Sequence, residues 1–125
     1  MTLPPSVRVF LAIAPTDMRR SFDSLAMMAR EVIRQEPLSG HLFVFRGRSG
    51  DRLKILWWDR SGFCLHYKRL EEGVFRFPEA EGGAAEISVA DLALILEGID
   101  LSGARREKRF SWPRKSSEYS VQNKK

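Results

Sequence analysis

The residues best suited to chemistry in this sequence are cations interleaved with aromatic rings between positions 41 and 70. This block holds 7 Lys or Arg and 2 Asp or Glu. Cations attract phosphates and flat rings stack on bases, so a nucleic-acid surface needs both kinds of side chain. An ordinary sheet with a charged outer face is the alternative explanation. The candidate DNA-binding residues of this block are Arg46, Arg48, Arg52, Lys54, Trp58, Arg60, Lys68 and Arg69.

A second basic segment follows at the C-terminus. Residues 102–125 lose all apolar periodicity and are dominated by Lys, Arg, Ser and Asn. We expect a disordered basic tail that adds sequence-independent attraction to phosphates, although a purely solubilising tail has the same composition. The formal net charge of the chain is +5, and residues 1–100 are close to neutral, so the tail supplies the surplus. Its candidate DNA contacts are Arg105, Arg106, Lys108 and Arg109.

Groups suited to catalysis or metal binding are few. Cys64 and His66 share one face of a predicted strand, where a thiol and an imidazole can act as nucleophile and base. With 2 His and 1 Cys in the chain, a closed tetrahedral metal site would need carboxylates, and the sequence predicts Asp51 and Asp59 in hairpin turns. No glycine-rich phosphate-binding motif occurs. We therefore expect no enzymatic activity, no metal and no cofactor, and keep a hydrolase based on Cys64 and His66 as the third hypothesis.

The charge pattern also offers a different kind of surface. Residues 71–100 hold 8 Asp or Glu and 1 Arg. Such an acidic block can be a solvated surface, or it can dock a basic protein partner. The second hypothesis is therefore a protein–protein adaptor that uses this acidic 71–100 face.

Hydrophobic periodicity predicts the elements that position these residues. Residues 7–13 alternate as in a strand, and residues 17–36 repeat apolar side chains every three or four positions, as in an amphipathic helix. Thr16 or Asp17 fits the cap of this helix, and Ser21 offers a later start. The buried stripe is expected at Phe22, Leu25, Met28 or Ala29, and Val32.

The basic block itself reads as three antiparallel strands at 41–47, 52–59 and 63–70, joined by short turns that contain Gly and Asp. Alternation predicts one wholly apolar face and one face that mixes aromatic rings with two lysines and a histidine. We place Lys54, His66 and Lys68 together on that mixed face.

The last part of the domain is turn-rich and ends in a short helix. Residues 74–77 are expected to form a short edge strand, and 88–97 a helix with a capping box from Ser88 to Asp91 and a terminal Gly98. The predicted fold is α+β, with a mostly antiparallel sheet of four or five strands packed against one main helix and a second short C-terminal helix. We expect a single domain over 1–101 and the basic tail over 102–125.

Other features of the sequence limit the environment. No apolar run approaches the roughly 20 residues of a membrane-spanning helix. Pro4, Pro5 and Arg8 interrupt the N-terminus before a signal-peptide core forms. A single cysteine suits a reducing compartment, so we expect a cytoplasmic protein without a membrane partner.

Three stretches together resemble a known family. They are TDMRRSFDSLA (16–26), GHLFVFRGRSGDRLKILWWDRSGFCLHYKRLEEGVF (40–75) and LALILEGID (92–100). Over about residues 6–100 they resemble the small TnpB accessory proteins of insertion sequences of the IS-sixty-six family, which share only their name with the RNA-guided nuclease TnpB. The resemblance implies a bacterial mobile-element protein that assists transposition, while a separate transposase cuts and joins the strands. It supplies no catalytic residues.

Residues and resemblance together lead to the first hypothesis. It is a non-enzymatic transposition accessory protein that binds DNA, expected at the ends of the element, through its basic and aromatic sheet surface and its tail. The transposase of the same element is the expected protein partner, and the sequence leaves the oligomeric state open.

Overall fold

Five strands form one sheet in the computed structural model, which describes residues 6–98. The strand order is β4-β3-β2-β1-β5, so β1 lies inside the sheet and β4 and β5 are its edges. β1 runs parallel to β2, and every other neighbouring pair is antiparallel. The strands are β1 (Val9–Ala12), β2 (Leu42–Arg46), β3 (Arg52–Trp58), β4 (Phe63–Arg69) and β5 (Ala84–Ile87).

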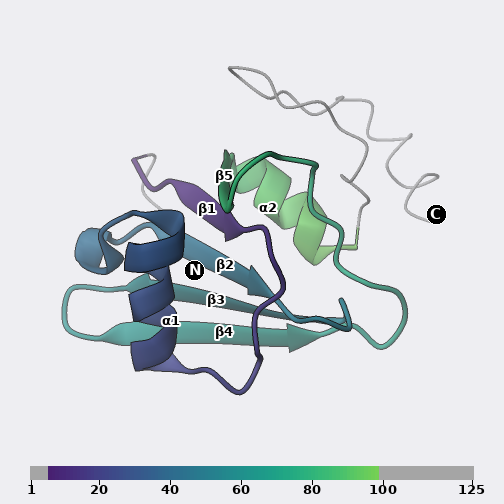
Figure 1. Ribbon diagram of the computed structural model, residues 1–125, viewed down its shortest axis with the longest axis horizontal. Helices are drawn as coiled ribbons and strands as arrows, with labels where there is room; N and C mark the ends of the chain where they lie inside the picture. The colour runs from purple at the N-terminus through teal and green to yellow at the C-terminus, as the bar shows by residue number, and fades with distance from the viewer. Residues whose placement is uncertain (1–5, 99–125) are drawn as a thin grey trace.

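Helical segments cover the two faces of this sheet. α1 (Phe22–Met28) continues into a π-helical turn, η1 (Ala29–Ile33), and crosses in front of the strands in Figure 1. A short 3-10 turn, η2 (Pro37–Ser39), leads into β2, and α2 (Val89–Leu96) packs on the opposite face. Among the described residues, no helix is long and apolar enough to cross a bilayer. The architecture is the predicted α+β fold with a main helix and a second short helix.

The core consists of two apolar layers, one on each face of the sheet. On the α1 side, Leu25 and Ala29 pack with Phe43 and Phe45. The opposite layer joins alternate strand residues to Phe75, Phe77, Leu92 and Ile95. Residues 42–45 of β2 are buried on both faces of the sheet, which explains its unbroken apolar run.

The main helix differs from its prediction in start and in face. It begins at Phe22 after Ser21, so neither Thr16 nor Asp17 caps it. Leu25, Ala29 and Ile33 are buried, whereas Phe22 and Val32 are 43% and 41% exposed. In the π-turn the N–H of Arg34 donates to the C=O of Ala29, which widens the spiral and places Ile33 toward the sheet in place of Val32.

The segment 74–77 was wrongly predicted as the edge strand. It carries no strand, and the edge is β5. Phe75 and Phe77 are buried because the segment folds over the end of the sheet, where the N–H of Phe75 donates to the C=O of Gly50 at 2.7 Å. The predicted capping box at Ser88 and Asp91 is confirmed.

The predicted mixed face of the sheet is also wrong. The register pairs Lys54 with Tyr67, Ile55 with His66 and Leu53 with Lys68. Paired residues share a face and neighbours along a strand alternate. Lys54 therefore lies on the α1 side, and His66 and Lys68 lie on the α2 side.

Candidate nucleic-acid interface

Three exposed arginines of the predicted set lie at one end of the sheet. Arg48 lies in the β2–β3 turn, and the register places Arg52, at the start of β3, opposite Arg69, at the end of β4. We call Arg48, Arg52 and Arg69 the arginine end. Gly50 adopts φ +86° in the turn between the first two, where a side chain would be strained.

All three arginines of the arginine end are exposed, and they differ in the partners that their guanidinium groups have. Arg48 makes no hydrogen bond or ion pair within the described residues, and Arg52 donates to the Tyr67 hydroxyl at 3.4 Å. Arg69 forms an exposed ion pair with Glu71 at 3.3 Å, which contributes little to stability and can be exchanged for another anion. The ring of Tyr67 is 48% exposed beside these cations.

Lys54 has a structural role inside the fold. Its side chain is buried, and Nζ donates to the backbone oxygens of Met18 and Arg20 at 2.8 and 2.7 Å. The ammonium also lies 4.6 Å from the centre of the Tyr67 ring. Lys54 thus fixes the loop before α1, and its buried ammonium does not face a ligand at the surface.

Arg46 and Lys68 are likewise occupied by the fold. The Arg46 guanidinium donates to the carbonyls of Phe75 and Ile13 and stacks 4.2 Å from the centre of the Phe77 ring. Burial lowers the pKa of Arg46 from its ordinary value. Lys68 donates to the C=O of Leu96 at 2.8 Å, which places a cation at the C-terminal end of α2.

The remaining predicted residues do not join the arginine end. Trp58 and Arg60 lie at the opposite end of the sheet, where Trp58 packs edge-to-face on Phe63 at 5.1 Å. Arg60 occupies the β3–β4 turn with φ 87°. The predicted tail residues Arg105, Arg106, Lys108 and Arg109 lie outside the described residues.

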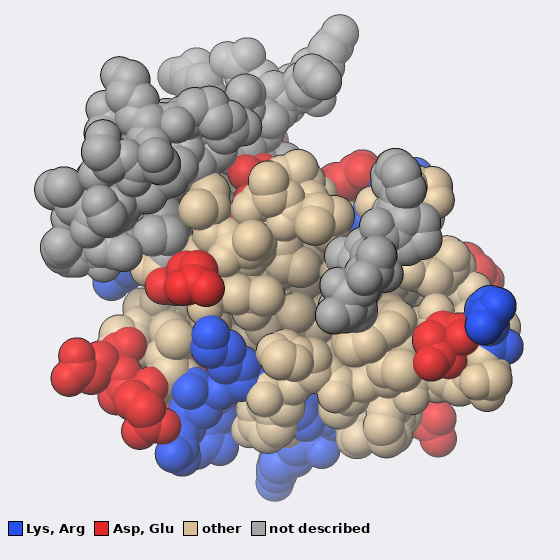
Figure 2. Space-filling model, turned by 180° about the vertical axis from the view of Figure 1, so that it is seen from behind, with Lys and Arg blue, Asp and Glu red and all other residues tan. Residues whose placement is uncertain are grey.

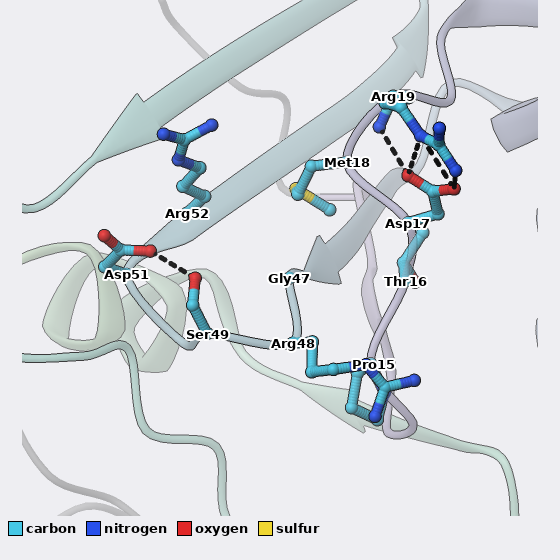
Figure 3. A pocket seen from close by; sticks show the side chains of 10 residues that line it. All are labelled: Pro15, Thr16, Asp17, Met18, Arg19, Gly47, Arg48, Ser49, Asp51 and Arg52. Carbon is cyan, nitrogen blue, oxygen red and sulfur yellow. Dashed lines mark hydrogen bonds and ion pairs between the residues drawn. The ribbon is translucent and has the colours of Figure 1, made fainter.

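A pocket of about 460 Å³ adjoins the arginine end (Figure 3). Residues 15–19 form one wall and residues 47–52 the other. We call it the Thr16 pocket. Thr16 forms a parallel bridge with Gly47, and its N–H donates to the C=O of Arg46 at 2.8 Å, which holds the two stretches together.

The walls meet closely because residue 47 has no side chain. A Cβ there would lie 2.7 Å from Cγ of Met18. Thr16 is 4% exposed, and its Oγ1 has no hydrogen-bond partner within the described residues. Sequence reasoning missed Thr16 and Arg19 as site residues, and the signal that could have found them is the TDMR stretch that carries the family resemblance.

The acidic groups of the Thr16 pocket are already paired. Asp17 receives the N–H of Arg19 and four hydrogen bonds in all from that residue, at 2.8 to 3.2 Å. These bonds hold the pKa of Asp17 well below its ordinary value. Asp51 accepts from the Ser49 hydroxyl at 2.6 Å, and this bond lowers its pKa.

Cys64 and His66 do not form a catalytic pair in this geometry. The thiol of Cys64 donates to Asp59 at 3.4 Å. Burial, followed by this hydrogen bond, raises the pKa of Cys64 above its ordinary value, which disfavours the nucleophilic thiolate. The described residues contain no group of three or more His, Cys, Asp or Glu side chains placed to hold a metal ion.

The acidic residues of 71–100 are spread over several elements. Glu71 pairs with Arg69, Glu86 pairs with Arg8 at 2.8 Å, and Asp91 is buried in the capping box of α2. Figure 2, seen from the side away from α1, shows acidic and basic side chains in separate small groups on a largely uncharged surface. The described part of the acidic block therefore forms no single continuous acidic face on this side.

Comparison with known proteins decides the family. The family described as IS66 Orf2 like protein matches residues 7–107. The chain belongs to this IS66 Orf2-like family. Members are insertion-sequence proteins associated with transposition by the element's transposase.

Two relatives come from Sinorhizobium fredii (strain NBRC 101917 / NGR234). Uncharacterized protein y4hO is 55% identical over 95 residues, which is 76% of this chain and 83% of the relative. Uncharacterized protein y4jC is 35% identical over 101 residues, or 81% of this chain and 86% of the relative. No solved structure matches the chain.

Proposed function

We propose that this IS66 Orf2-like protein is a non-enzymatic accessory factor that binds DNA through the arginine end. The observation that carries the proposal is the placement of Arg48, Arg52 and Arg69 at one end of the sheet, two of them without an ion pair to a carboxylate. Guanidinium groups bind phosphate oxygens in a planar, paired geometry. Tyr67, whose side chain is exposed, supplies the ring beside them.

Local charge supports this proposal better than total charge does. Residues 1–100 are close to neutral, so the folded part has no general attraction to nucleic acid. Three phosphate contacts at the arginine end predict a slope of about −2.7 for log Kobs against log salt concentration. The basic tail would make the slope of the full chain steeper.

A salt titration of the full chain tests the proposal. Fluorescence anisotropy would follow a labelled duplex from the element end, for wild type and for Arg48→Gln, Arg52→Gln and Arg69→Gln. Each substitution should weaken binding and reduce the steepness of the salt slope by about 0.9. Arg60→Gln, at the opposite end of the sheet, is the matched control and should leave both unchanged. Wild-type affinity and wild-type salt slope in all three arginine-end variants would overturn the proposal.

The adaptor hypothesis is the competing outcome. It requires that the transposase co-purifies with the protein and that charge reversal at Glu71, Glu72 and Glu97 abolishes this co-purification. Because Glu71 and two further acidic residues are paired or buried in the fold, we favour DNA as the direct ligand and the transposase as a partner at the same DNA. Element DNA and transposase both lie in the bacterial cytoplasm, so the proposal includes that location.

A further inference from the structure

The Thr16 pocket contains a buried hydroxyl without a partner. Buried polar groups in folded proteins are almost always hydrogen-bonded, so an exception calls for an explanation such as a water, an ion or a ligand group that it binds. The side chain of Thr16 is buried by its bridge to Gly47, on the wall of a pocket that also carries Arg48 and Arg52. A hydroxyl beside guanidinium groups can donate to an anion.

The charges around the pocket favour an anion as that ligand. Asp17 is neutralised by Arg19. Asp51 keeps its charge, accepts from Ser49 and is attracted to Arg52 and Arg69. Within the described residues Arg48 forms no ion pair, and Arg52 is attracted to Asp51 without forming one, so the cations outnumber the acids on this lining. In Figure 3 the side chain of Arg48 extends toward Pro15, on the side of the pocket away from Asp51.

The size of the pocket indicates more than a free ion. A volume of about 460 Å³ falls in the range of small-molecule sites. It leaves room for the sugar on either side of a phosphate as well as for the phosphate itself. Gly47 lets Met18 pack against the turn, and any larger residue there would press on Met18 and disturb this wall.

We propose that the Thr16 pocket binds one phosphate group of a DNA strand. Oγ1 of Thr16 has almost no accessible surface, so binding requires a small shift of the 15–19 wall that lets this hydroxyl donate to one phosphate oxygen. The guanidinium of Arg48 neutralises the phosphate charge from the rim. Arg52 lies on the other wall, toward the neighbouring phosphates of the arginine end. This inference rests on the proposed function and names the place where the strand is held most closely.

Thr16→Val is the decisive variant, because it replaces a hydroxyl by a methyl of similar size. The hydroxyl has no partner in the fold, so the variant should keep at least the wild-type melting temperature. Loss of a hydrogen bond to a charged group should weaken DNA binding about tenfold. The salt slope should stay unchanged, because a neutral hydroxyl displaces no counterion. Ser61→Ala, which removes a hydroxyl at the opposite end of the sheet, is the matched control and should bind as wild type.

Inorganic phosphate provides a second, independent measurement on the full chain. Titration followed by amide NMR should shift the signals of Thr16 and Gly47 in wild type and not in Thr16→Val. A duplex with a 5′-terminal phosphate can be compared with the same duplex ending in a hydroxyl. If Thr16→Val weakens binding, tighter binding of the phosphorylated duplex by wild type places a strand end in the pocket, and equal binding places a backbone phosphate there.

The failure of this inference differs from the failure of the proposed function. If DNA binds with the expected salt slope, while Thr16→Val binds equally well and phosphate shifts neither amide, the phosphate pocket is refuted and DNA binding stands. If DNA does not bind, while phosphate shifts both amides in wild type alone, the DNA function is refuted and the pocket remains as a site for free phosphate.

Discussion

Replacement of the buried Lys54 by methionine should destabilise the protein without removing a DNA contact. Lys54→Met keeps a side chain of similar length in the α1-side layer and removes the ammonium. Nζ donates to two backbone oxygens at 2.7 and 2.8 Å, and these belong to the loop that forms one wall of the Thr16 pocket. The loop then loses its anchor to β3.

The size of the effect follows from these contacts. Hydrogen bonds to a charged group contribute about 1.5–3 kcal/mol each, and the contact with the Tyr67 ring adds about 1 kcal/mol. Relief of the buried ammonium's desolvation offsets several kcal/mol of this sum, and water can reach the carbonyl of the exposed Arg20. We expect a net loss of about 2 kcal/mol, or about 8 °C in melting temperature for a domain of this size.

Calorimetry and urea unfolding measure the stability, and anisotropy measures the salt slope. Arg52→Met is the matched control, two residues earlier on the same strand face and exposed, and it should change stability by less than about 0.5 kcal/mol while reducing the slope. The reasoning is refuted if Lys54→Met melts as wild type and reduces the salt slope by about 0.9. Lys54 would then contact phosphate, as its place in the basic block first indicated.

Three further predictions concern other parts of the fold. Burial lowers the pKa of His41 below 6.5, so the unfolded chain binds more protons just below that pH and stability should fall as the pH drops from 7.5 to 5.5; urea midpoints at the two pH values measure this. Ser88→Ala removes the capping box of α2 and should cost about 1 kcal/mol in urea unfolding. Gly47→Ala should lower the melting temperature by its clash with Met18, and the double variant with Met18→Ala should recover part of the loss.

Each of these predictions has its own control. The loss of stability between pH 7.5 and 5.5 should be smaller in His41→Asn than in wild type. An equal change in urea midpoint in both proteins would contradict the assignment to His41. Ser6→Ala alters an exposed hydroxyl near β1, and it should unfold as wild type if the capping argument holds. For position 47, strict additivity of the two substitutions would show that the close contact with Met18 carries no strain.

The sequence predicted the elements where periodicity is local. The meander β2–β4 needs only alternation and turn residues, and the capping box of α2 is a four-residue pattern. Alternation within each strand does not give the register between β3 and β4, so Lys54 was wrongly predicted to share a face with His66 and Lys68. The π-turn after Met28 likewise shifts the buried stripe by one residue, which no i, i+3, i+4 pattern predicts.

The candidate site was predicted only in part, because it depends on tertiary placement. Arg48, Arg52 and Arg69 lie in one predicted block and at one end of the sheet, whereas Arg60 lies at the far end of the same strands. Arg46 looks like its neighbours in sequence, yet the fold of 74–77 over its guanidinium makes it structural. The Thr16 pocket joins positions 31 residues apart, and only the parallel bridge brings them together.

The position of β1 inside the sheet has a consequence for synthesis of the protein. β2, β3 and β4 follow one another in the chain and can pair as soon as they leave the ribosome. β1 emerges first, but one of its two neighbours, β5, is made late. Arg8, just before β1, bonds to Glu86 of β5, which is 78 residues further along the chain. Contacts of such long range form slowly. The first strand to be made therefore gains its last neighbour only when nearly the whole described chain has been translated, and until then one edge of β1 stays open to other chains.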